Sequence, residues 1–157
     1  MLLFRPILLL AFAWCAPAFA DPDPTFPVGS AENDALALAA PFAEANPDFT
    51  LRQDYWNGQL TPEKGTAFRL QFFKGNTYRM FLGVEKEKLP EGASLMLYVI
   101  DPKNRPIEAS EPSLANATQL SHQAKKTGLY LVLMRVLLES DATLDAPLDA
   151  VMIYGWE

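Results

Sequence analysis

The sequence predicts an all-β protein: an antiparallel β-sandwich of jelly-roll type with about eight strands and a short N-terminal helix packed on one sheet. Three segments carry this prediction, residues 75–84, 94–107 and 128–138. Each is dense in β-branched, aromatic and leucine residues, and each is entered or left through a Gly, Asn or Pro turn. Short strands separated by such turns at regular spacing are typical of sandwiches.

Residues 1–20 form the first predicted unit, a secretory signal peptide. They contain one basic residue, Arg5, then an apolar run over residues 7–14, and a small-residue triplet at 18–20 that is typical of a cleavage site. The apolar run is far shorter than the roughly 20 residues that span a bilayer, so no membrane span is expected. Cleavage before Asp21 would also remove Cys15, the only cysteine, and would leave a periplasmic or secreted protein without disulfides.

The composition limits the classes of partner. The chain has a net charge of −6 and no cluster of Lys and Arg residues. Such an acidic chain binds nucleic acid and anionic membrane surfaces poorly. We therefore expect no nucleic-acid partner.

Two segments precede the sandwich. Residues 21–29 contain three prolines and are predicted to be an extended leader. Residues 30–47 are predicted to be helical, with Ser30 or Asn33 as the cap and apolar residues at helical spacing at 35, 38, 39 and 42. Pro41 interrupts this pattern, so we expect a kinked helix or two short pieces ending near Ala45.

The sandwich domain is predicted over residues 48–157. A first short strand is expected at 55–60 and a strand with one buried face at 68–72. A tight turn at 74–76 leads into a strand at 77–84, which predicts that these last two strands form a hairpin. Further strands are expected at 95–100, 106–109, 119–125, 129–138 and 148–156.

The strands at 95–100 and 129–138 are apolar on both faces. One face of a two-sheet sandwich normally meets water, so something is expected to cover these strands. The helix near Ala35 is the favoured cover, and a dimer interface is the alternative.

Three motifs add a family resemblance: Gly75 followed by Tyr78, an L-x-L-Y-V strand ending in Asp-Pro at 95–102, and Thr-Gly-x-Tyr at 127–130. Together they resemble the bacterial pre-peptidase C-terminal domain over residues 55–156. The resemblance implies an exported sandwich of the kind usually appended to secreted hydrolases, here in a stand-alone version. Family members often enter the central strand through an acidic D-x-D-L pattern, and some are credited with calcium. This chain has no carboxylate at 94–97.

No catalytic residue is predicted. His122 is the only histidine, and it lies in a polar run with no acidic partner or nucleophile motif nearby, so we expect an ordinary surface or strand-edge residue. Paired carboxylates are the one catalytic device that the composition permits, in the loops around 85–91 and 139–149. Charged loops are more often simply solvated.

No cofactor is predicted except, as a candidate, calcium. The best cation site in the sequence is the series Asp141, Asp145 and Asp149, because calcium takes carboxylate oxygens.

Aromatic residues provide the candidate ligand-binding site: Tyr55 and Trp56, and Tyr154 and Trp156. One member of each pair could face outward and stack on a sugar ring. The alternative is that these rings pack at the edge of the sandwich.

The favoured hypothesis is an exported, non-enzymatic β-sandwich acting as a binding or accessory module for a protein or surface partner, as a monomer or homodimer. A carbohydrate-binding module that uses exposed aromatics is the alternative, and a small carboxylate-dependent hydrolase comes third.

Overall fold

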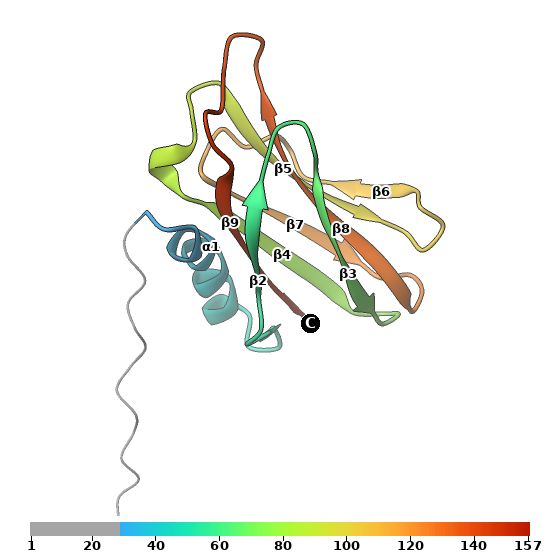
Figure 1. The fold of residues 1–157 in the computed structure, drawn as a ribbon. Helices are drawn as coiled ribbons and strands as arrows, with labels where there is room; N and C mark the ends of the chain where they lie inside the picture. Colours follow the sequence, from blue (N-terminus) through green and yellow to red (C-terminus); the bar gives the residue numbers. More distant parts are fainter. Residues whose placement is uncertain (1–28) are drawn as a thin grey trace, which may run out of the picture.

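The computed structural model describes residues 29–157 and contains two antiparallel β-sheets packed face to face, with one helix on the outside (Figure 1). This confirms the prediction of an all-β sandwich with a short helix packed on one sheet. The predicted signal peptide at 1–20 and the predicted leader up to residue 28 lie outside the described residues.

We name the two sheets A and B. Sheet A has the order β1-β9-β4-β7, and β2 also pairs with β9. Its strands are β1 (Thr50–Leu51), β2 (Trp56–Leu60), β4 (Thr77–Val84), β7 (Ala117–Gln123) and β9 (Leu148–Trp156). Sheet B has the order β3-β8-β5-β6. Its strands are β3 (Thr66–Phe72), β5 (Ala93–Ile100), β6 (Pro106–Ala109) and β8 (Gly128–Leu138).

The main core lies between the sheets and follows the two-residue period of the strands. Leu95, Leu97 and Val99 of β5 are fully buried there, while their sequence neighbours point outward. Phe72 lies at the centre of an aromatic group, with its ring 3.9 Å from that of Tyr78 and 4.9 Å from that of Tyr130. Removal of these apolar side chains from water is the main stabilising contribution to the fold.

The predicted hairpin between residues 68–72 and 77–84 is wrong. β3 pairs with β8, and β4 pairs with β7 and β9, so the turn at 73–76 carries the chain from one sheet to the other. Gly75 provides the left-handed backbone of that turn, with φ of 99°. Alternation in the sequence shows that each strand has one buried face. It does not show whether two strands joined by a tight turn pair in one sheet or lie in two sheets that face each other across the core.

Helix α1 (Ala31–Ala45) begins at Ser30, whose hydroxyl oxygen accepts a hydrogen bond from the backbone N–H of Asn33 at 3.2 Å. The helix continues through Pro41 and ends at Ala45 as expected, so of the two expected forms, a kinked helix and two short pieces, the second is wrong. Pro41 and Ala37, the residue four positions earlier, are both exposed. Pro41 has no N–H to donate to the Ala37 carbonyl, and this carbonyl therefore remains accessible to water.

The helix packs on sheet A through small residues. Ala31, Ala35 and Ala39 are buried against β4 and β9. At Gly83 of β4 the backbone of the helix approaches so closely that an added Cβ would collide with the carbonyl oxygen of Ala31 and the nitrogen of Ala35. This close approach fixes which sheet the helix can cover.

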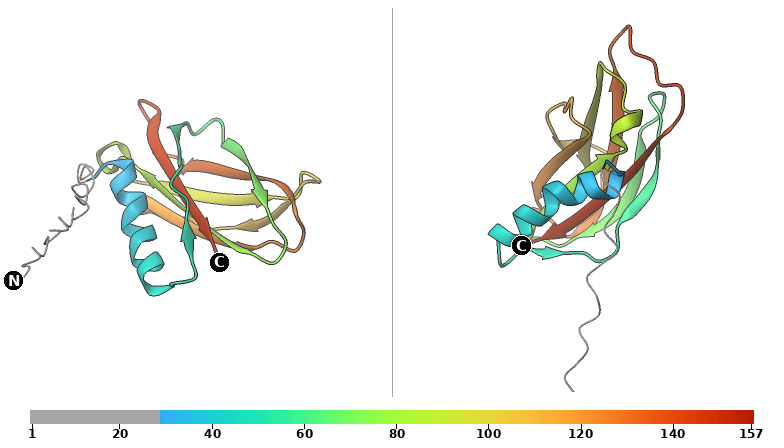
Figure 2. Two further views of the ribbon diagram at one scale, coloured as in Figure 1. Left: turned by 90° about the horizontal axis from the view of Figure 1, so that it is seen from below. Right: turned by 90° about the vertical axis from the view of Figure 1, so that its left-hand side faces the viewer.

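The helix was expected to cover the strands at 95–100 and 129–138, and this expectation is wrong. These strands are β5 and β8 of sheet B, whereas α1 lies on the outer face of sheet A (Figure 2). Large side chains project outward from β5 and β8, and they offer no gap like that at Gly83. No element of residues 29–157 packs over the outer face of sheet B.

Candidate functional site

The outer face of sheet B carries a continuous set of apolar side chains. Antiparallel pairing places Tyr98 opposite Leu133, and Ile100 opposite Leu131, on this face. Leu129 extends the set and has 55 % of its surface exposed, while the other members are half-buried by one another. We call this set the apolar stripe; it consists of Met96, Tyr98, Ile100, Leu129, Leu131 and Leu133.

Two arginines accompany the apolar stripe. Arg69 of β3 lies opposite Leu131, and Arg135 of β8 lies opposite Met96. Neither guanidinium takes part in any of the ion pairs formed among residues 29–157. The outward positions of β3, β5 and β8 contain these two cations and no carboxylate.

A hollow of about 390 Å³ opens at one end of the stripe. Arg69, Leu129 and Leu131 line it, together with the turn that follows β5. Asp101 in that turn also borders the hollow, but Arg105 neutralises its carboxylate, with Nη2 2.6 Å from Oδ2. The hollow therefore combines apolar walls with an unpaired guanidinium.

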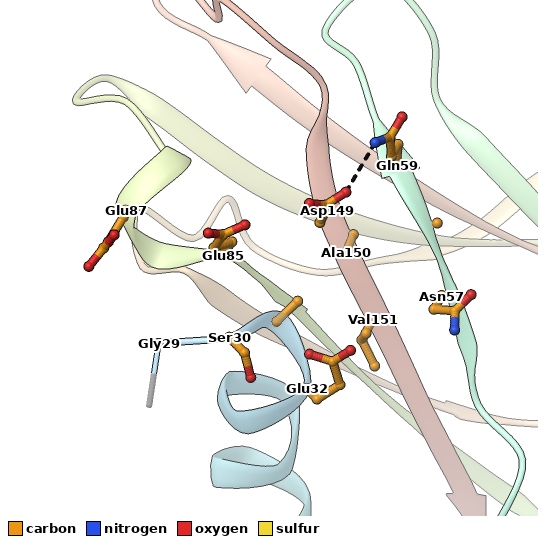
Figure 3. Close-up of a pocket in the computed structure, with 12 residues that line it drawn as sticks. Gly29, Ser30, Glu32, Asn57, Gln59, Glu85, Glu87, Asp149, Ala150 and Val151 are labelled. Carbon is orange, nitrogen blue, oxygen red and sulfur yellow. Dashed lines mark hydrogen bonds between the residues drawn. The ribbon is translucent and has the colours of Figure 1, made fainter. Parts of the chain in front are cut away.

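A second concave region is an acidic groove of about 610 Å³ at the start of α1 (Figure 3). Four carboxylates line it, from the first turn of the helix, the segment after β4 and the start of β9: Glu32, Glu85, Glu87 and Asp149. Asn57 and Gln59 of β2 form the opposite side.

Neighbouring groups stabilise the charged form of Asp149. Gln59 donates a hydrogen bond to Asp149 at 3.1 Å, and the Lys88 ammonium lies 3.1 Å from Asp149 and 2.6 Å from Glu85. The hydrogen bond from Gln59, followed by that from Lys88, lowers the pKa of Asp149 below its ordinary value. A carboxylic acid that donates a proton to a glycosidic oxygen needs a raised pKa, so this arrangement does not suit Asp149 for that role.

The structure separates the three residues of the predicted cation site. Asp149 lies in the acidic groove, Asp145 borders a different hollow beside Glu87 and Pro90, and Asp141 is exposed in the loop before β9. Within residues 29–157 no group of three or more His, Cys, Asp or Glu side chains is arranged to hold a metal ion. The calcium site remains a prediction from sequence.

Three of the four predicted ligand-binding aromatics pack against the main core. The Trp56 ring stacks on Phe68 of the other sheet, with centroids 6.3 Å apart. Tyr154 and Trp156 are half-buried on β9, and the Arg52 guanidinium lies 5.7 Å and 6.0 Å from their ring centroids. Burial is the main reason that the pKa of Tyr154 is raised.

The fourth aromatic, Tyr55, lies apart from the other three rings. It is 43 % exposed and lines a small hollow with Leu36 of the helix and Leu51 of β1. The four rings therefore do not form one flat platform of the kind that stacks on a sugar.

His122 differs from the sequence expectation of an ordinary surface or strand-edge residue. It lies on β7, an edge strand, but points inward and is only 7 % exposed. Its ring lies 6.1 Å from that of Phe72 and 5.8 Å from that of Tyr130, and Nδ1 is 3.5 Å from Glu108 of β6. The polar letters around it in the sequence gave no sign of this burial.

The sequence did contain the signal for the apolar stripe, because the strands at 95–100 and 129–138 are apolar at both odd and even positions, and therefore on both faces. What it did not contain was the information that nothing in residues 29–157 covers the second face.

None of the helices among these residues is long and apolar enough to cross a membrane. No protein-family model and no curated protein matches this chain.

Proposed function

We propose that this chain is an exported, non-enzymatic binding or accessory module, and that the apolar stripe on sheet B is its docking surface for a protein partner. The observation that carries the proposal is the uncovered outer face of β5 and β8, where apolar side chains occupy the positions that usually meet water. A contiguous exposed apolar patch on a folded domain is a common mark of an interaction surface.

The alternation on the neighbouring strands strengthens this interpretation. The outward positions of β3 are Ala67, Arg69 and Gln71, which are all exposed and mostly polar, as expected for a solvated sheet face. The apolar character is therefore absent from β3 and continues from β5 and β8 onto Pro106 and Ala109 of β6, which pair with Ile100 and Tyr98. Surface leucines scattered singly would need no explanation, but these are neighbours on paired strands.

The proposal includes the jelly-roll description and a stand-alone relationship to the bacterial pre-peptidase C-terminal domain. The three motifs that suggested it fall on β4, β5 and β8, and their tyrosines have structural roles. The Tyr78 hydroxyl accepts a hydrogen bond from the Phe73 N–H at 2.8 Å, and the Tyr130 hydroxyl donates one to the Lys126 carbonyl at 2.9 Å. Both bonds tie a turn to the strand that follows it.

A selection experiment tests the docking surface. A random-peptide display library is panned against the immobilised protein, and the affinity of the selected peptides is measured in solution. We expect Leu131→Glu and Ile100→Glu to weaken binding about tenfold or more, since each places a charge in the apolar stripe.

Ala37→Glu is the matched control, because it adds the same charge on the exposed side of α1. It should leave the affinity unchanged. Circular dichroism and thermal melting establish that all three variants are folded. Selected peptides that bind equally to all three variants would place the docking site elsewhere and contradict the proposal, as would a library that yields no binder.

A further inference from the structure

We infer that the partner of the apolar stripe presents acidic side chains beside its apolar ones, an inference that rests on the proposed function. The carrying observation is the pair of unneutralised guanidiniums at the stripe: Arg69 lies beside it on β3, and Arg135 lies at its end on β8. A partner with carboxylates at matching positions satisfies both cations on docking.

The contrast with the rest of the chain makes these cations informative. The protein has 19 acidic and 13 basic residues, yet the outward positions of β3, β5 and β8 include two arginines and no carboxylate. Elsewhere Arg52 and Arg105 each have an Asp partner within the chain, and the Arg79 guanidinium lies 3.8 Å from the centroid of the Phe42 ring. Among residues 29–157, the two arginines on the uncovered face have neither an ion-pair partner nor an aromatic ring beneath the guanidinium.

The hollow beside Arg69 indicates how one acidic side chain would fit. Leu129, Leu131 and Arg69 line the hollow, and the Asp101 carboxylate at its border is already paired with Arg105. A carboxylate entering here leaves bulk water, which strengthens its interaction with arginine. Arginine suits this role because its planar group can donate two parallel hydrogen bonds to one carboxylate.

Charge disfavours a second copy of this chain as the occupant. Two copies that packed stripe against stripe would bring four guanidiniums to one interface and no carboxylate from the outward positions of β3, β5 and β8. Like charges enclosed in an apolar interface are costly.

The shape of the face disfavours a membrane. Of the stripe residues only Leu129 is more than half exposed, while the other five are half-buried. Such a surface lacks the protruding apolar side chains that enter a bilayer interface.

Two matched peptide libraries test the inference. Both alternate apolar residues with variable positions; one library offers Asp, Glu or Ser at those positions, and the other offers Lys, Arg or Ser. We expect binders only from the acidic library. Their affinity should fall about tenfold in the double variant Arg69→Gln with Arg135→Gln. It should also fall when NaCl is raised from about 50 mM to about 500 mM.

The double variant Lys86→Gln with Lys125→Gln is the control, since it removes the same charge from exposed sites outside sheet B. It should leave the affinity of the acidic peptides unchanged. Equal enrichment of both libraries, with binding still lost in Leu131→Glu, would overturn the acidic preference and leave the docking surface standing. No binder from either library would remove both.

Two further measurements test the other two possible occupants of the apolar stripe, a second copy of the chain and a membrane. Sedimentation analysis across a range of protein concentrations should give a monomer, and flotation with vesicles of phosphatidylglycerol should leave the protein unbound. A dimer abolished by Leu131→Glu, or vesicle binding abolished by the same variant, would overturn the acidic protein partner.

Discussion

Replacing Gly83 with alanine tests whether α1 depends on the close approach of its backbone to sheet A. The added Cβ would meet the carbonyl oxygen of Ala31 and the nitrogen of Ala35. Both are backbone atoms, so no side-chain rotation can relieve the collision and the helix itself must move. Overpacking of this kind typically costs about 1–3 kcal/mol of the free energy of unfolding.

Complete detachment of the helix would cost more than this. It would expose Phe81, Val151 and Ile153, which are buried beneath α1. At about 1.5–3 kcal/mol for each large apolar side chain, the loss would reach about 5–9 kcal/mol, which is comparable with the whole stability of a small domain. We therefore expect Gly83→Ala to shift the helix outward rather than release it.

The assay combines urea denaturation with hydrogen exchange. Denaturation followed by circular dichroism gives the loss in free energy of unfolding. Exchange measured by mass spectrometry should show weakened protection in residues 31–45 and unchanged protection in β5 and β8. Weakened protection of the helix alone is the signature of local loosening.

Gly75→Ala is the control variant. An added Cβ at Gly75 meets nothing within 4 Å, but φ there is 99°, so alanine is strained by about 1 kcal/mol without touching the helix. Protection of residues 31–45 should stay as in the unmodified protein. If Gly83→Ala changes the free energy of unfolding by less than about 0.5 kcal/mol and leaves helix protection intact, the close-approach argument is refuted.

Three further predictions follow from the packed aromatics and the polar groups. Titration with a panel of glycans should leave tryptophan fluorescence unchanged, because Trp56 and Trp156 pack against the core; a saturable change with one glycan would contradict this. Hydrogen bonds from Arg105 lower the pKa of Asp101, so Asp101 stabilises the fold above its unfolded pKa and loses that contribution as pH falls through its lower folded pKa. Asp101→Asn should therefore be less stable than the unmodified protein at pH ~7 and equally stable below pH ~2, as measured by denaturation; a constant difference would count against the ion pair. His122→Phe should change the free energy of unfolding by less than about 1 kcal/mol, since it removes a buried Nε2 that has no hydrogen-bond partner within residues 29–157; a larger loss in thermal unfolding would indicate a bonded imidazole.

Local signals predicted the elements well. The cap at Ser30 and the strand at 148–156 are where the sequence placed them, since short-range spacing and turn residues determine such features. The strand expected at 106–109 is also present, and it pairs with the strand at 95–100 across a turn. In each case the information lies within about ten residues of chain.

The predictions that failed concern which strands pair with each other and which sheet the helix covers. Residues 68–72 and 77–84 have the alternation of a hairpin, but β3 pairs with β8, and β4 pairs with β7 and β9. The position of the helix was decided by Gly83, a single residue lying in a strand about fifty residues from the helix start. For the candidate site, the sequence indicated the apolar strands, but the predicted ligand-binding residues were aromatics that included Tyr154 and Trp156. The sequence does not show that the Arg52 guanidinium lies beside these two rings.

The place of β9 has a consequence for when the protein can fold. This strand comes late in the chain, yet it lies inside sheet A, pairing with β1, β2 and β4 and contacting α1. A nascent chain that lacks residues 148–156 cannot complete sheet A or bury the helix fully, because α1 packs on both β4 and β9, and contacts so distant in sequence form slowly. Such delayed completion of sheet A would suit the export that we propose.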